Sequence, residues 1–235
     1  MLARELREQA LEANLALPAH GLVVFTWGNA SAVDHAADLL AIKPSGVSYD
    51  ELKASDMVLL EVSSGRVVEG TLRPSSDTPT HLVLAREFKP GGIVHTHSRY
   101  ATAWAQAGLD LPCYGTTHAD YFSGGVPLTR HLTPEEVNAG YEEATGHVIV
   151  ETFRERGLDP RSVPGVLLHG HASFVWGTDA HEAVHNAVVL EEVAQMAYLA
   201  RTLNPALSEL PAHVLDKHHS RKHGPDAYYG QAEPT

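Results

Sequence analysis

The segment GGIVHTHS, residues 91–98, combines a structural signal with a chemical one. Gly91 and Gly92 release the chain from a helical pattern into a short apolar, β-branched run that is typical of a strand. His95 and His97 lie two residues apart on this predicted strand, so their side chains share one face of the sheet. Two imidazoles on one face can converge on a single metal ion.

A second His-x-His pair, His169 and His171 in LLHGH, ends another predicted strand just before a loop. Three imidazoles and one carboxylate suit a zinc-type ion and leave a position open for substrate. Asp77, in RPSSDTPTH, is the candidate carboxylate, although its place directly before a helix is also typical of an N-cap. Spacing alone leaves a metal site and a coincidental histidine pattern both open.

Helical and strand patterns on both sides of this segment predict one α/β domain spanning residues 1–235. Helices are predicted over residues 2–18, 78–88, 134–156 and 180–203, with a short one after residue 213. Further strands are predicted at LVVF (22–25), LLAI (39–42), MVLLEV (57–62), GVLLH (165–169) and SFVW (173–176). Strands so close in sequence favour a mixed or mainly antiparallel sheet with helices on its faces.

The composition narrows the class of protein. A formal net charge of -12 over 235 residues argues against a nucleic-acid partner, although a local basic pocket can still bind one small phosphate. The single cysteine, Cys113, excludes an internal disulfide and a cysteine-based zinc site. The charged N-terminus and the absence of a long apolar run predict a cytoplasmic protein without a membrane segment. No GxGxxG or GxxxxGK[ST] motif points to a dinucleotide or to ATP.

Six strings resemble the sugar-phosphate epimerases of the class II aldolase/epimerase family, in the same order and nearly end to end. They are TWGNASAV (26–33), IKPSGV (42–47), PSSDTPTH (74–81), GGIVHTHS (91–98), GTTHADYF (115–122) and RKHGPDAYYGQ (221–231). The resemblance implies a three-layer α/β/α fold with a central, mostly antiparallel sheet. It also implies a homotetramer with active sites at subunit interfaces, where a tail from about residue 213 to 235 contributes to a neighbouring site.

The resemblance further assigns roles to residues. The implied ligands of a divalent metal, Zn²⁺ or else Mn²⁺ or Co²⁺, are Asp77, His95, His97 and His171. The implied phosphate-binding residues are Gly28, Asn29, Lys43, Ser45, Gly46, Ser75 and Ser76. The implied acid/base pair is Asp120 and Tyr229, with Tyr229 coming from a neighbouring subunit. His169 is left with a structural or supporting role, and Thr116, His218 and Glu142 are weaker candidates.

The implied activity interconverts L-ribulose 5-phosphate and D-xylulose 5-phosphate by cleaving and re-forming a carbon–carbon bond. A class II aldolase of the L-fuculose-1-phosphate type is the alternative enzyme, because it shares the metal and the cleavage step. Such aldolases usually carry a Glu where this chain has Asp77. A non-catalytic metal-binding or assembly protein on the same fold is the alternative from another class.

Overall fold

The computed structural model describes residues 3–224 and 227–228, and its centre is a seven-stranded sheet. The strands follow the order β4-β3-β2-β1-β5-β7-β6, and each neighbouring pair is antiparallel. The bounds are Gly28–Asp34 (β1), Leu39–Ile42 (β2), Val58–Glu61 (β3), Val67–Glu69 (β4), Gly92–Thr96 (β5), Gly165–Leu167 (β6) and Ser173–Gly177 (β7). The predicted mainly antiparallel sheet is confirmed.

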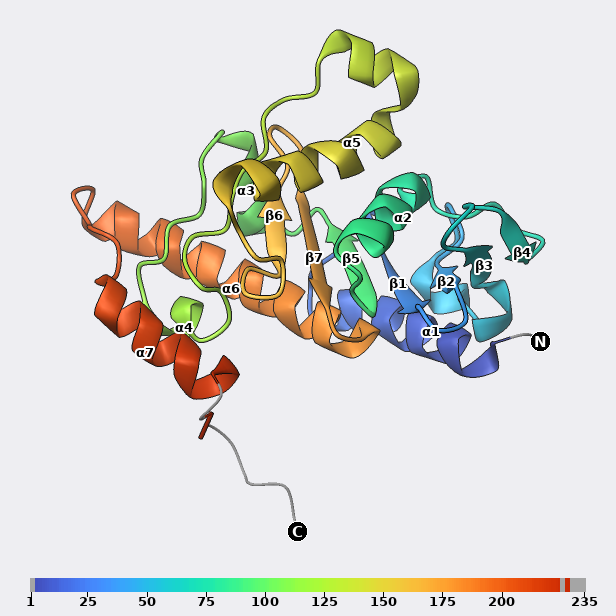
Figure 1. Cartoon of the computed structure of the whole chain (residues 1–235), viewed down its shortest axis with the longest axis horizontal. Coiled ribbons are helices and arrows are strands. Elements are labelled where there is room, and N and C mark those ends of the chain that lie inside the picture. The colour runs from blue at the N-terminus through green and yellow to red at the C-terminus, as the bar shows by residue number, and fades with distance from the viewer. Residues whose placement is uncertain (1–2, 225–226, 229–235) are drawn as a thin grey trace.

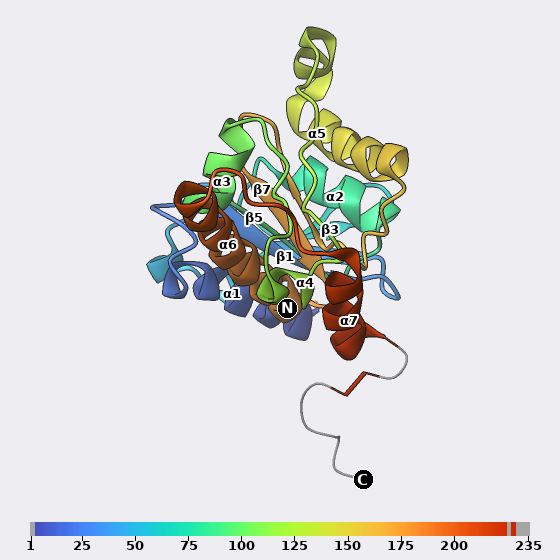
Figure 2. The same ribbon diagram turned by 90° about the vertical axis from the view of Figure 1, so that its left-hand side faces the viewer.

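Helices cover both faces of the sheet and give the predicted three layers. Helices α1 and α6 run along one face, while α2 and α5 lie over the other (Figures 1 and 2). The helices are Arg4–Ala19 (α1), Thr78–Glu87 (α2), Arg99–Gln106 (α3), Thr116–Ala119 (α4), Pro134–Arg156 (α5), Ala180–Leu203 (α6) and Ala212–His223 (α7). None of the described helices has the length and apolar character needed to cross a membrane.

Local sequence signals fix the ends of the long helices. Thr133 caps α5 by accepting a hydrogen bond from the backbone N–H of Glu136, and the Glu136 side chain in turn accepts one from the backbone N–H of Thr133. Pro134 occupies the first turn, and Gly157 ends the helix in a left-handed conformation. Asp179 caps α6 in a similar way through the N–H of Glu182. Both helices therefore begin where their caps predict, and α5 ends at its glycine.

Strand β1 is the main departure from the predicted elements. The run LVVF at 22–25 is not a strand but an irregular segment, in which Phe25 has a φ of 53° and is 78% exposed. The strand begins instead at Gly28 and uses the small residues GNASAVD. Asn14 of α1 exchanges hydrogen bonds in both directions with the backbone of Ala30, so helix and strand lie close together. Small side chains permit this approach, and a search for apolar runs overlooks them.

Candidate active site

One open cavity of about 620 Å³ lies where strand β5 ends and where the loops beside β1, β2 and α2 meet. It brings together every predicted phosphate-binding residue and every predicted metal ligand. Its lining consists of Gly28, Asn29, Lys43, Ser45, Gly46, Ser75, Ser76, Asp77, His95, His97 and His171, with Thr26, Trp27, Pro44 and Tyr141. A larger groove of about 1050 Å³, near the start of α1, contains none of these residues.

The imidazoles of three histidines converge at one end of the cavity. Each of His95, His97 and His171 offers a nitrogen, and these nitrogens lie within 4.8 Å of one another. The Nε2 atoms of His97 and His171 are 3.2 Å apart. Two nitrogens bound at about 2.0 Å to a tetrahedral zinc ion lie about 3.3 Å from each other. The spacing of these two histidines therefore fits joint ligation of one ion.

The neighbours of two of these rings, His95 and His171, engage the Nδ1 atoms. Nδ1 of His95 is 2.9 Å from the carbonyl oxygen of Ser173, to which it donates, and the ring stacks on Phe174 at a centroid distance of 4.4 Å. Nδ1 of His171 lies 3.2 Å from the hydroxyl oxygen of Tyr141. With each Nδ1 engaged in this way, the Nε2 lone pairs remain available to a metal.

His97 and His171 are in the protonation state that a metal requires. Burial, reinforced by the charges of His95 and His97, lowers the pKa of His171 to about 4. Burial also lowers the pKa of His97. Both imidazoles are therefore neutral near pH 7, and a metal does not have to displace a proton from them.

Asp77 supplies a carboxylate to the same cavity. It occupies the N-cap position of α2, yet its side chain makes no capping hydrogen bond. Oδ2 instead accepts a hydrogen bond of 2.6 Å from Nδ2 of Asn29. Burial opposes ionisation, but His95, His81 and the Asn29 hydrogen bond hold the pKa of the Asp77 carboxyl below its usual value. Asp77 is thus a charged group in the same cavity as the histidines. It is not one of the three residues whose ligand atoms lie within 4.8 Å of one another.

The other end of the cavity suits an anion. Lys43 is 2% exposed, and its Nζ donates to the carbonyl oxygens of Pro44 and Val47 beneath the ring of Tyr49. Burial lowers the pKa of this lysine, since the charged form loses hydration. Gly46 has a φ of 73°, which allows the neighbouring loop to turn tightly beside the lysine. A buried ammonium beside hydroxyls and loop N–H groups attracts a phosphate.

Asp120, one of the two predicted acid/base residues, does not line this cavity within one chain. Asp120 ends α4 and accepts hydrogen bonds from Arg221 Nη2 at 2.6 Å and from His218 Nδ1 at 3.0 Å, both on α7. Burial acts to raise the pKa of Asp120, and these two partners lower it below its usual value. Tyr229 lies outside the described residues.

Tyr141 is a site residue that the sequence reasoning missed. Neither the His-x-His spacing nor the six matched strings point to Tyr141, which lies on α5, lines the cavity and contacts His171. Its only local sequence signal is the preceding Gly140, which interrupts the helix. His169, by contrast, stacks on His131 at a centroid distance of 3.6 Å and does not join the three-histidine group. The two histidines of the second pair therefore have different surroundings.

The fold and the cavity define a class II aldolase-type domain. Residues 8–198 match the class II aldolase and adducin N-terminal domain, and the chain belongs to this family. Among solved structures, it is similar to an L-fuculose 1-phosphate aldolase, with 24% identity, a TM-score of 0.78, and 94% of this chain and 97% of that chain covered.

YgbL from Klebsiella pneumoniae, described as a candidate aldolase/epimerase/decarboxylase, is similar at 25% identity with a TM-score of 0.72, covering 93% of this chain and 100% of that one. An L-fuculose-1-phosphate aldolase from Thermus thermophilus has 23% identity and a TM-score of 0.65, with 88% of this chain and 100% of that one covered. Such likeness supports the fold, whereas the reaction has to be argued from the site.

Proposed function

We propose that this protein is an L-ribulose-5-phosphate 4-epimerase, an isomerase that interconverts L-ribulose 5-phosphate and D-xylulose 5-phosphate. The observation that carries the proposal is a single cavity in which three converging histidines lie beside a buried lysine and small-residue loops. Asp77 stands where the related aldolases usually have Glu, which favours an epimerase over an aldolase. The strings HADYF (118–122) and YYG (228–230) also favour an epimerase.

The reaction has to invert carbon 4, whose hydrogen is not adjacent to the carbonyl at carbon 2. A base removes the proton of the carbon-4 hydroxyl, the bond between carbons 3 and 4 breaks, and its electron pair passes into an enediolate. The aldehyde fragment, glycolaldehyde phosphate, rotates and presents its opposite face. Carbon 3 then attacks that face, and an acid on the other side returns a proton to the new alkoxide.

Residues of the cavity are assigned to the two fragments. Asp77, His95, His97 and His171 would hold the divalent ion, with Zn²⁺ favoured by the imidazole-rich set. This ion supplies Lewis-acid stabilisation of negative charge on the enediolate oxygens. Lys43 and the loops at 28–29, 45–46 and 75–76 hold the phosphate, which keeps the rotating aldehyde from escaping.

Acid/base groups on opposite sides of the aldehyde complete the proposal. Among the described residues that line the cavity of one chain, Asp77 is the only carboxylate and Tyr141 the only phenol. The remaining titratable groups are the three histidines and Lys43. We therefore infer that Asp120 and Tyr229 act at sites shared between subunits of a homotetramer. Helix α7 supports this arrangement, because it holds Asp120 and leads into the segment that contains Tyr229.

Incubation with L-ribulose 5-phosphate separates the epimerase from the aldolase. We expect D-xylulose 5-phosphate to accumulate to equilibrium with little free glycolaldehyde phosphate, because the phosphate loops retain that fragment. A coupled assay for the epimer and a separate assay for the free aldehyde measure the two outcomes. Abundant free aldehyde without epimer would contradict the epimerase and favour an aldolase, which the similarity to L-fuculose 1-phosphate aldolase also makes the second candidate.

Replacing Lys43 with Met is expected to raise KM for the phosphorylated substrate by roughly 10- to 100-fold. A hydrogen bond to a charged group contributes about 1.5–3 kcal/mol, and each 1.4 kcal/mol is a tenfold change in affinity. Steady-state kinetics measure the effect. The matched control is Lys53→Met, because Lys53 is exposed and lies outside the cavity. An unchanged KM in Lys43→Met would remove Lys43 from phosphate binding.

A non-catalytic metal-binding or assembly protein on this fold makes different predictions. Such a protein would bind the ion and show no turnover of any phosphorylated ketose after metal is restored. Metal analysis of the purified protein, together with assays before and after chelation, separates the two cases. An epimerase loses activity with the ion and regains it with added Zn²⁺, Mn²⁺ or Co²⁺.

A further inference from the structure

Helix α5 bends sharply just before the candidate active site. Gly140 has φ 158° and ψ 88°, so the helix is interrupted between its first turns and its long second arm. The first arm projects away from the domain, while the second lies over the sheet beside α2 (Figures 1 and 2). Tyr141 is the first residue after the bend and faces the cavity. The direction of the bend therefore decides where this side chain lies.

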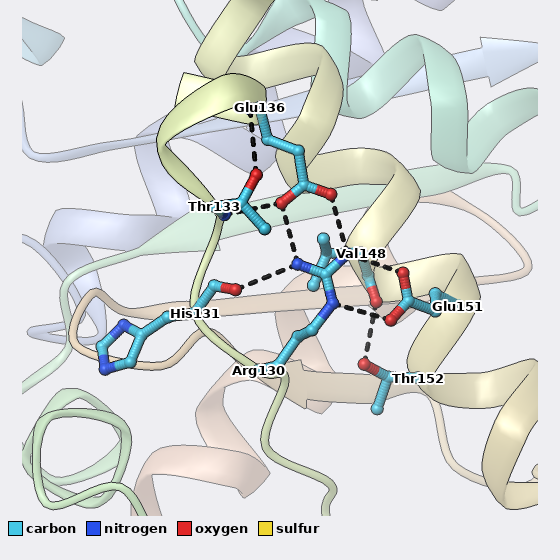
Figure 3. Close-up of polar contacts among 7 residues, drawn as sticks. All are labelled: Arg130, His131, Thr133, Glu136, Val148, Glu151 and Thr152. Carbon is cyan, nitrogen blue, oxygen red and sulfur yellow. Dashed lines mark hydrogen bonds and ion pairs between the residues drawn. The ribbon is translucent and has the colours of Figure 1, made fainter. Parts of the chain in front are cut away.

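Arg130 joins the two arms of α5 (Figure 3). Its Nη1 and Nη2 donate to both carboxylate oxygens of Glu136, on the first arm, at 2.8 and 2.7 Å. Its Nε and Nη2 donate to both oxygens of Glu151, on the second arm, at 2.7 and 2.8 Å. Exposed single ion pairs contribute little, but two bidentate pairs on one guanidinium impose a definite geometry. The Glu136–Arg130–Glu151 group is called the arginine clamp below.

The bend brings Tyr141 to one of the three converging histidines. Its hydroxyl oxygen lies 3.2 Å from Nδ1 of His171, while Nε2 of the same ring lies 3.2 Å from Nε2 of His97. When Nε2 of His171 is the ligand atom, Nδ1 carries the ring proton and donates a hydrogen bond to the Tyr141 oxygen. His95 has the carbonyl oxygen of Ser173 as its Nδ1 partner. Tyr141 is the corresponding partner of His171.

We propose that Tyr141 is a positioning residue that fixes the tautomer and orientation of His171, and that the arginine clamp holds the bend of α5 which places it there. The inference rests on the proposed metal site. Partners of this kind typically change metal affinity by roughly 10- to 100-fold when they are removed. Helix α5, which contains none of the six strings that resemble the family, thereby controls the metal affinity of the site.

Zn²⁺ affinity, measured by competition with a chromophoric chelator, tests the positioning role. We expect Tyr141→Phe to bind Zn²⁺ roughly 10- to 100-fold more weakly than the wild type, with an unchanged thermal unfolding midpoint of the apo-protein. The visible spectrum of the Co²⁺-loaded variant should also change, because His171 is no longer held in one orientation. The matched control is Tyr114→Phe, which loses only a hydrogen bond from Arg201 outside the cavity.

The clamp is tested separately with Arg130→Gln. We expect faster hydrogen exchange of the backbone amides at 135–141 and a several-fold loss of Zn²⁺ affinity. Arg154→Gln is the control, because Arg154 on α5 is outside the clamp: its side chain is 77% exposed and lies 4.0 Å from Glu87. Wild-type Zn²⁺ affinity in Tyr141→Phe overturns the positioning role, and wild-type affinity in Arg130→Gln overturns the clamp. A wild-type protein that binds no metal overturns the proposed function as well.

Discussion

Replacing His97 with Ala is expected to abolish stoichiometric metal binding and to lower epimerase turnover by roughly 1,000-fold or more. The ring contributes one of three nitrogens within 4.8 Å, and its Nε2 lies 3.2 Å from that of His171. Lewis-acid stabilisation of the developing charge contributes several kcal/mol, and about 4 kcal/mol corresponds to about 1,000-fold in rate. Elemental analysis of the purified variant and assays with added Zn²⁺ measure the two effects.

His169→Ala is the matched control from the second His-x-His pair. Because His169 stacks on His131 and does not join the three-histidine group, its loss should leave metal content and most turnover in place. The contrast tests the assignment directly. Full metal content in His97→Ala, or loss of metal in His169→Ala, would mean that the ligands are not the ones proposed.

Replacing Tyr229 with Phe is expected to lower epimerisation by roughly 100- to 10,000-fold, the range for loss of a general acid or base. Metal content and the unfolding midpoint should be unchanged, since only one hydroxyl is removed. The control is Tyr228→Phe, because the neighbouring Tyr228 is 63% exposed with Lys217 near its ring. Near-normal turnover in Tyr229→Phe would remove this residue from the mechanism.

Mixed oligomers reveal whether the tail serves a neighbouring site. Subunits carrying His97→Ala and subunits carrying Tyr229→Phe should each be nearly inactive. If active sites are shared, refolding the two variants together restores part of the activity, because some interfaces combine an intact metal site with an intact Tyr229. If both groups act within one chain, the mixture stays as inactive as its parents.

The sequence predicted the long helices because their signals are local. The Thr133–Glu136 capping box and the following Pro134 mark the start of α5, and its end at Arg156 precedes Gly157. The strand that carries His95 was also predicted, since β-branched residues after Gly91-Gly92 need no distant partner to be recognised. Strand β1 was missed because its small residues are buried by α1 and the neighbouring strands, and hydrophobicity does not report that contact.

By itself, the sequence determined the type of fold through the patterns of its helices and strands. Its resemblance to the family identified most of the residues that line the cavity. Only the tertiary structure decided how those residues face one another. It showed that His169 stacks on His131 while His171 joins the other two histidines, placed Asp120 against α7 instead of the cavity, and brought Tyr141 to a histidine thirty positions along the chain. Such contacts depend on how a bent helix and a sheet pack together, and no spacing along the chain encodes that arrangement.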